Sequence, residues 1–135
     1  MRVYFIFDIK DEFKKLYFGH ENKLYSILKS IYHLSKEEID YGYSLLNQIT
    51  IPMDKERINR DLFVKLHREV PYSLRDGVHY YNQLYKDEVS RLVVGRFFIK
   101  IEVDQKSSSF FTELKRFSNN LFVCDFYTTN YFYIS

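Results

Sequence analysis

Residues Ile9–Glu21 read I-K-D-E-F-K-K-L-Y-F-G-H-E and directly follow a strand-like run. The stretch begins as helices do, because Asp8 can cap the first turn and acidic side chains follow it. Gly19 stands where a helix commonly ends in a left-handed residue. We therefore predict a helix of about two and a half turns. A helix this short is marginal by itself, so packing must hold it in place.

Aromatic side chains are the unusual feature of this helix. Phe13 and Tyr17 lie one turn apart on one face, together with Leu16. Two interpretations of these rings stay open: all three aromatics, Phe18 included, belong to the core, or Phe13 and Tyr17 anchor a partner. Off this face the helix carries three lysines: Lys10, Lys14 and Lys15.

Two blocks of sequence resemble a known family. The run Y-F-I-F-D-I-K-D-E-F-K-K-L-Y-F-G-H-E-N-K-L at Tyr4–Leu24 resembles the opening of the sporulation inhibitor of replication protein family, SirA. Near the other end, F-F-T-E-L-K-R-F-S-N-N-L-F-V-C-D-F at Phe110–Phe126 and Y-F-Y-I at Tyr131–Ile134 are similar to that family's last helix and strands. Where the family pattern would have Arg and Trp, this chain has His20 and Tyr133.

The resemblance implies a protein that inhibits the initiation of DNA replication as endospore-forming bacteria enter sporulation. Such a protein acts by contact, through the N-terminal domain (domain I) of the initiator DnaA, and needs no cofactor. The contact residues that carry over are Phe13 and Tyr17, plus a polar residue late in the third helix. Adding two neighbours on the first helix, the expected partner-binding residues are Phe13, Lys14, Tyr17, Phe18 and either Asn47 or Gln48.

Composition indicates one globular domain with an excess of aromatic residues. A chain of 135 residues with 46% hydrophobic and 28% charged residues suits a single domain with its own core. The 13 Tyr and 13 Phe include more tyrosine than a core of this size needs. Tyrosine supplies rigid contact area at low entropic cost, so this excess favours an interface.

Charge and cysteine content narrow the partners and the compartment. The net charge of +2 comes from interleaved signs, which form no basic stripe for nucleic acid. The lone Cys124 sits in an apolar run, where a buried inert thiol is expected. Without a signal peptide or an 18-residue apolar run, we expect a cytoplasmic protein with no membrane contact. Nothing in the sequence sets the oligomeric state, and a monomer is our default expectation.

Motifs for catalysis and metal binding are missing. The four histidines form no H-E-x-x-H, and a single cysteine offers no zinc site. There is no G-x-S-x-G elbow and no phosphate loop, and only 4 glycines are available to build one. We assign no catalytic residue and no metal ligand. An acyltransferase-like enzyme stays as a less favoured alternative, because an α+β domain can hide its site in backbone geometry.

Single-stranded nucleic acid is the main alternative partner. Basic residues interleave with aromatic ones in two places, as they do in platforms that stack bases and neutralise phosphates. A solvated sheet face with ordinary counter-charges produces the same pattern, so we do not expect direct nucleic-acid binding. The residues concerned are Lys14, Lys15, Tyr17 and Phe18, and Arg96, Phe97, Phe98 and Lys100.

Apolar periodicity and the residues that cap or end helices predict the elements of the first half. Arg2–Phe7 is apolar at nearly every position, which favours a central strand covered on both faces. Gly42 lies inside a predicted helix, where it lowers helix stability but is compatible with close packing. Cap and stop signals define three helices: one capped by Asn22, one from Lys36 to about Gln48 behind a Ser35–Glu38 capping box, and one capped by Asp54 and closed by Pro71.

The second half is richer in strands. Ser73–Tyr85 has helical spacing, and we predict a helix there, although its aromatics and Gly77 leave a strand possible. The other elements are a hairpin of Val89–Val94 and Phe97–Val103, a helix bearing Phe110, Phe111, Leu114 and Phe117, and strands at Leu121–Phe126 and Asn130–Ile134. Residues 1–135 should thus form a single α+β domain, with a mostly antiparallel sheet of about five strands packed with about five to six helices.

Overall fold

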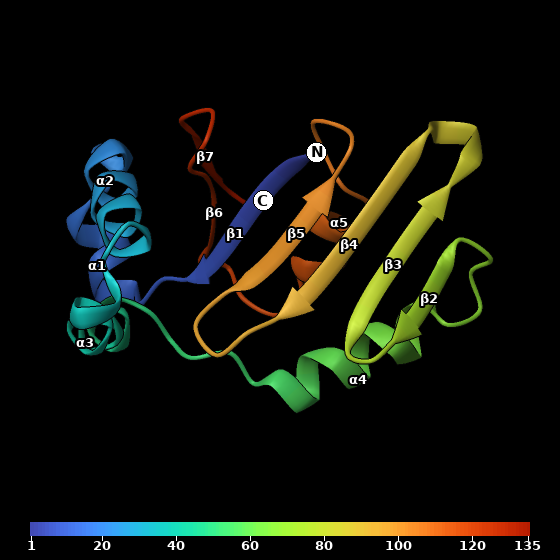
Figure 1. The fold of residues 1–135 in the computed structure, drawn as a ribbon, viewed down its shortest axis with the longest axis horizontal. Coiled ribbons are helices and arrows are strands. Elements are labelled where there is room, and N and C mark those ends of the chain that lie inside the picture. The colour runs from blue at the N-terminus through green and yellow to red at the C-terminus, as the bar shows by residue number, and fades with distance from the viewer.

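Strand β1 (Arg2–Asp8) lies inside an antiparallel sheet of seven strands in the computed structural model, which describes residues 1–135. On its two sides it pairs with β5 (Ile99–Val103) and β6 (Leu121–Asp125). The other strands are β2 (Tyr72–Arg75), β3 (Val78–Gln83), β4 (Glu88–Val94) and β7 (Asn130–Tyr133). The order across the sheet is β2-β3-β4-β5-β1-β6-β7 (Figure 1).

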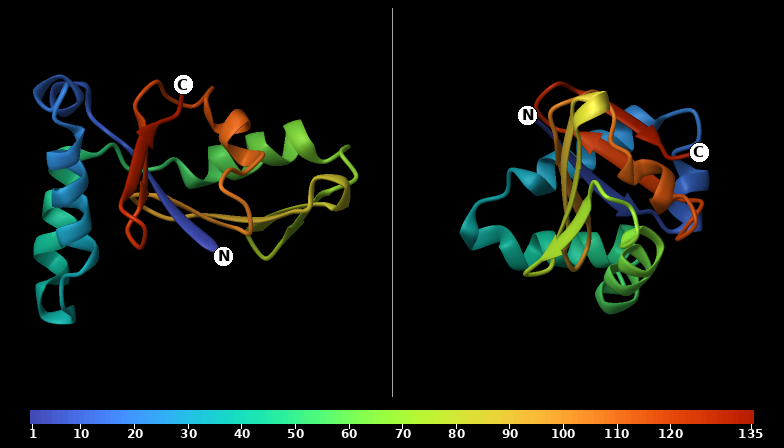
Figure 2. Two further views of the ribbon diagram at one scale, coloured as in Figure 1. Left: turned by 90° about the horizontal axis from the view of Figure 1, so that it is seen from above. Right: turned by 90° about the vertical axis from the view of Figure 1, so that its right-hand side faces the viewer.

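Helices cover the sheet unevenly. They are α1 (Asp11–Leu16), α2 (Glu21–Tyr32), α3 (Ile39–Ile49), α4 (Lys55–Leu66) and α5 (Phe110–Leu114), with short 3-10 turns at Lys36–Glu38 and Leu84–Lys86. Figure 1 shows α1, α2 and α3 gathered at one end of the molecule, with β2 and β3 at the other. Figure 2 shows α4 and α5 together on one side of the sheet. The α+β class is therefore confirmed.

Alternation along β1 divides the interior into two cores. Tyr4 and Ile6 join a cluster of 18 buried residues under α4 and α5. Phe5 and Phe7 point the other way, into a cluster of 12 buried residues under α2 and α3. Successive side chains of a strand face opposite sides of its sheet, so these two clusters lie on opposite faces. The prediction of a central strand covered on both faces is confirmed.

Several local signals act as expected. The Asp54 side chain accepts a hydrogen bond from the Arg57 amide at 3.3 Å and so caps α4. A Cβ added to Gly42 would lie 2.9 Å from Leu34 Cδ1, so this glycine does permit a close approach to α3. The β4–β5 hairpin is present, and on β5 Ile99 and Ile101 are buried.

The predicted helix at Ser73–Tyr85 is wrong. Strands β2 and β3 occupy this stretch and pair with each other through a turn at Asp76-Gly77. Both turn residues have positive φ, 52° and 76°, as a two-residue turn of a β-hairpin requires. These two strands account for the difference between the five strands expected and the seven observed. Strand pairing overrode the helical spacing of the side chains.

Two predicted helix caps are also wrong. Asp8 stays in β1, and its carboxylate accepts a hydrogen bond from Ser118 Oγ at 2.7 Å. Helix α1 consequently begins at Asp11 and has six residues, fewer than expected. Asn22 lies within α2, which begins at Glu21. The Ser35–Glu38 pair does form, at 2.9 Å, but it encloses a 3-10 turn that precedes α3.

A buried polar chain joins α4 to the β2–β3 hairpin. His79 is completely buried, with Nε2 2.8 Å from Asn59 Oδ1 and Nδ1 2.8 Å from the Tyr72 hydroxyl. Because a carbonyl oxygen only accepts, Nε2 donates to Asn59 and Nδ1 accepts from Tyr72. Burial lowers the pKa of His79 to about 4, which keeps the ring neutral at physiological pH.

We predict that Gly77→Ala lowers the free energy of unfolding by about 1 kcal/mol. No atom lies within 4 Å of an added Cβ, so the cost comes from the backbone, held at φ +76°. Urea unfolding measures the change, with the exposed β2 residue in Ser73→Ala as the control. An unchanged midpoint for Gly77→Ala would contradict the turn geometry.

The neutral His79 predicts a pH-dependent stability. The unfolded chain, with the ordinary histidine pKa of about 6.5, binds a proton before the folded chain does. This contribution is therefore complete well above pH 6.5 and is lost as the pH drops towards 4, by about 3 kcal/mol. Urea titrations at pH 7 and pH 4.5 should show this loss in the parent protein and less of it in His79→Gln. Equal losses in both would show that His79 does not control the effect.

Candidate functional site

Helix α1 and the residue that follows its end expose large apolar side chains. None of its residues is buried. Leu16, the last residue of the helix, is 65% exposed, and Phe18, two residues further on, is 82% exposed. Phe13 and Tyr17 are partly buried and pack on the core beneath α2 and α3. Of the two interpretations of the aromatics, Phe18 is not a core residue, whereas Phe13 and Tyr17 are shared between core and surface.

Backbone and side-chain hydrogen bonds tie the start of α1 to the end of α3. The Lys10 amide donates to the carbonyl of Ile49 at 3.0 Å, and Lys10 Nζ donates to the carbonyl of Asn47 at 2.8 Å. The side chains of Asn47 and Gln48 are exposed at this junction. The end of α3 therefore lies beside α1, as the expected contact residues require.

A second set of bonds holds α1 to the loop before β6. Lys14 Nζ donates to the Asn119 carbonyl at 2.9 Å and to Asn120 Oδ1 at 3.1 Å, and it lies 5.0 Å from the centre of the Tyr133 ring. The Asn120 amide group donates in turn to the Ile9 carbonyl at 3.0 Å and to the Asp11 carboxylate. Because none of the six residues of α1 is buried, these hydrogen bonds hold the helix where a buried apolar face otherwise would.

The lysines of α1 are not equivalent. The ammonium groups of Lys10 and Lys14 each donate a hydrogen bond to a carbonyl oxygen of the chain itself. Lys15 is exposed, and its ammonium group makes no hydrogen bond or ion pair within the chain. A shallow hollow beside the helix is lined by Asp11, Lys14, Lys15, Phe18 and Asn120.

Burial changes two titrating groups beneath this surface. It raises the pKa of the Asp8 carboxyl above its ordinary value, against the hydrogen bond from Ser118, which lowers it. It also raises the pKa of Tyr133 to about 12, so the ring under Lys14 stays neutral. Neither group is exposed in a way that suggests proton transfer to a substrate.

The structure brings most of the expected contact residues together. We call the group formed by Phe13, Leu16, Tyr17, Phe18, Asn47 and Gln48 the α1 surface. Lys14 lies next to it but acts inward, as a tether. Leu16 was placed with the core face by its spacing, and its exposure was not expected. The sequence did not predict that Asn120 bonds to Ile9 and Asp11, because these partners lie more than 100 positions away along the chain.

Three further features bear on metal binding, thiol chemistry and membrane insertion. No group of three or more His, Cys, Asp or Glu side chains is arranged to hold a metal ion. Cys124 is fully buried, as expected, and burial raises the pKa of its thiol. No helix has both the length and the apolar character to cross a lipid bilayer.

Comparison with known families covers nearly the entire chain. A family model described as "Sporulation inhibitor of replication protein SirA" matches residues 2–135. The chain belongs to this family. Membership in the SirA family makes it a sporulation inhibitor of replication, and the family is one of regulatory proteins rather than enzymes. The match includes the middle of the chain, where the two similar sequence blocks are absent. No curated protein matches the chain.

The second aromatic and basic stretch is largely structural. Phe97 is buried, and the Arg96 guanidinium lies over its ring, 4.9 Å from the ring centre. Phe98 is partly buried and packs edge-on against Phe5, with 5.2 Å between ring centres. A base has no free ring face on Phe97 to stack against, so this part of the pattern reflects the core of the SirA fold.

Stability measurements separate the rings of the α1 surface. We expect Phe18→Ala to leave the free energy of unfolding unchanged within about 0.5 kcal/mol, because this ring is exposed. Phe13→Ala and Tyr17→Ala should each cost about 1–2 kcal/mol, since they lose partial packing on the core. Urea unfolding of the three variants tests the order. A large loss for Phe18→Ala would place its ring in the core.

Proposed function

We propose that the chain inhibits the initiation of DNA replication by binding the N-terminal domain (domain I) of the initiator DnaA through its α1 surface, as a monomer. Family membership supports an inhibitor of replication. The observation that carries the proposed site is the 82% exposure of Phe18 next to Phe13 and Tyr17. Exposed aromatic side chains of this kind mark sites of protein association.

The α1 surface has the composition of a binding hot spot. Phe13 and Tyr17 are rigid rings one helical turn apart, and their inner edges are already packed. Leu16 and Phe18 add apolar area that a partner can cover, while Asn47 and Gln48 supply polar groups beside it. Interfaces commonly combine buried aromatic anchors with a surrounding polar rim.

Preorganisation supports the same proposal. Helix α1 is tied at Lys10 to the end of α3 and at Lys14 to the loop before β6. A partner therefore meets a helix that is already formed, and binding does not have to supply the cost of ordering it. A complex that buries about 1,000 to 1,600 Å² in total would suit a reversible inhibitor.

The charge of Lys15, beside the α1 surface, would guide the approach of a partner more than it would raise the affinity. Lys15 is the α1 lysine that has no partner within the chain, and it faces the solvent. An exposed charge at the edge of an interface mainly changes the association rate and its dependence on salt. We therefore assign Lys15 to the rim and the aromatic rings to the centre.

Binding to DnaA tests the proposal directly. The purified chain is titrated against the isolated N-terminal domain of its host's DnaA by calorimetry, with circular dichroism as the folding control. Phe13→Ala, Tyr17→Ala and Phe18→Ala should each weaken binding by about 2 kcal/mol, a factor of roughly thirty. The matched control is Tyr85→Ala, because Tyr85 is fully exposed in the 3-10 turn between β3 and β4. Strand β3 lies at the opposite end of the molecule from α1 (Figure 1).

Loss of affinity in folded α1 variants, with Tyr85→Ala unchanged, would support the proposed surface. If all four variants bind as tightly as the parent protein, the contact with DnaA lies elsewhere on the chain. No binding at tens of micromolar would reject the DnaA partner. Titrations with single-stranded DNA and with an acyl-coenzyme A then test the two remaining function classes.

A further inference from the structure

An apolar cavity lies between the α2–α3 pair and the sheet, separate from the α1 surface. Its volume is about 360 Å³, and eleven of its twelve lining residues are hydrophobic. Phe5 and Phe7 of β1 contribute from the sheet, and Leu28 and Leu46 contribute from α2 and α3. Ile39 and Tyr43 of α3 and Phe126, just after β6, also line the cavity.

The cavity has a buried floor and an open mouth. Phe5, Phe7 and Leu28 are buried, whereas Ile39 and Tyr43 are 47% and 43% exposed. A small molecule can therefore reach the cavity from solvent without local unfolding. The lining includes no charged side chain. Water inside would find few hydrogen-bond partners, because a stable buried water needs two to four polar groups.

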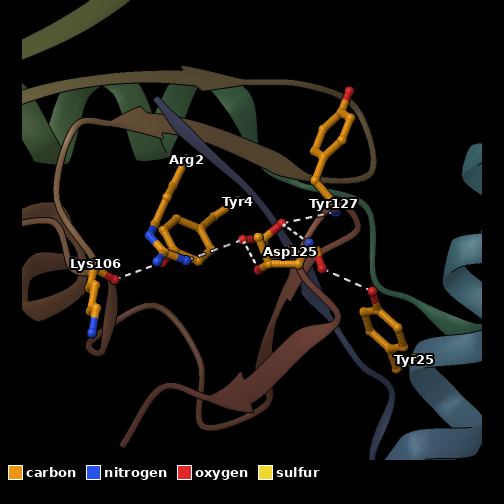
Figure 3. Close-up of polar contacts among 7 residues, drawn as sticks. Arg2, Tyr4, Tyr25, Lys106, Asp125 and Tyr127 are labelled. Carbon is orange, nitrogen blue, oxygen red and sulfur yellow. Dashed lines mark hydrogen bonds and ion pairs between the residues drawn. The ribbon is translucent and has the colours of Figure 1, made fainter.

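Polar contacts of Asp125, which Figure 3 shows, support the cavity from behind one of its walls. The buried Asp125 carboxylate accepts from the amides of Tyr127 and Thr128 at 3.0 and 3.1 Å, which fixes the turn after β6. The Tyr25 hydroxyl donates to the Asp125 carbonyl at 2.9 Å and so joins α2 to that turn. Phe126, between these residues, is thereby held against the cavity.

Aromatic contacts and a pair of hydroxyls complete this wall. The rings of Phe126 and Tyr32 stack with their centres 4.9 Å apart, and Phe126 also stacks on Phe5 at 5.5 Å. The hydroxyls of Tyr32 and Tyr127 lie 3.1 Å apart and satisfy each other. Side chains fixed in this way have little freedom to move in and fill the space.

Size and chemistry together define the occupant. A dry cavity of roughly 150 Å³ lined by Leu, Ile and Phe is enough to bind one benzene. Ligand pockets begin at about 300 Å³ and bind mostly apolar molecules. At about 360 Å³, this cavity has room for two to three rings, and its walls carry no group to pair with a charge. Aromatic walls favour flat ring systems, which stack on them.

We propose that this cavity is a binding site for one neutral apolar small molecule of two to three rings. The site is independent of the proposed DnaA contact, since it shares no residue with the α1 surface. Its occupant would link α2 and α3 to the sheet by filling the space between them. Binding of such a ligand to the folded chain alone would stabilise the fold by mass action.

Two fluorescent probes with the same aromatic skeleton test the site. N-phenyl-1-naphthylamine is neutral, and 8-anilinonaphthalene-1-sulfonate adds one negative charge. We expect the neutral probe to bind saturably, one per chain, and to raise the melting temperature. The sulfonate should bind at least about tenfold more weakly, because it would be desolvated without a counter-charge. Equal affinity for both probes, or no saturation by the neutral one, would overturn the proposal.

Variants locate the bound probe. Leu46→Phe places a larger side chain in the cavity and should reduce affinity for the neutral probe about tenfold or more. Ile39→Asp puts a charge at the mouth and should weaken binding as well, whereas Ser44→Asp, at an exposed position of α3 outside the cavity, is its matched control. Phe18→Ala should have no effect, because that exposed ring lies on a different surface.

Outcomes are distinguishable even if one variant is unstable. If Leu46→Phe does not fold by circular dichroism, the pair Ile39→Asp and Ser44→Asp decides. Equal probe affinity in that folded pair would overturn the proposed site, as would a higher melting temperature of Leu46→Phe with unchanged probe binding. Loss of binding in Phe18→Ala alone would place the probe on the α1 surface instead. None of these results depends on DnaA.

Discussion

Burial of β1 on both faces is the constraint on which the rest of the fold depends. Tyr4 and Ile6 need an apolar cover on one side of the sheet, and Phe5 and Phe7 need another on the opposite side. A single layer of helices cannot provide both. Helices α4 and α5 cover Tyr4 and Ile6, and helices α2 and α3 cover Phe5 and Phe7 on the opposite face. Strands on both sides of β1 complete the sheet.

The α1 surface follows from how the chain leaves β1. Helix α1, which follows β1, has six residues and none of them is buried. It is held by hydrogen bonds from Lys10 to a carbonyl oxygen of α3 and from Lys14 to one of the loop before β6. Hydrogen bonds from a charged donor are stronger than hydrogen bonds between neutral groups. Two of them can hold in place a short helix that packing alone would not hold. Fixing α1 in this way leaves Phe18 in solvent. The proposed binding to a partner would use this exposed ring on a helix that is already fixed.

Aromatic residues serve three different purposes in this domain. Some, such as Phe122, are completely buried, while Phe18 is open to solvent. Phe5 and Phe126 form a third group, rings that contact other rings and also line the cavity under α2 and α3. Aromatic side chains thus form part of the core, part of the cavity wall and the exposed part of the proposed α1 interface.

The sequence by itself determined the α+β class, the central position of β1, the Asp54 cap and the family. These features rest on local patterns, which act over a few residues. It also pointed to Phe13 and Tyr17 on one helical face, but not to their partial burial. Only the tertiary structure decided that Ser73–Tyr85 is a hairpin, because pairing with β4 outweighs its helical spacing. It alone assigned Lys14 to a tether, since the bond to Asn119 joins residues 105 positions apart, and no local rule reaches that far.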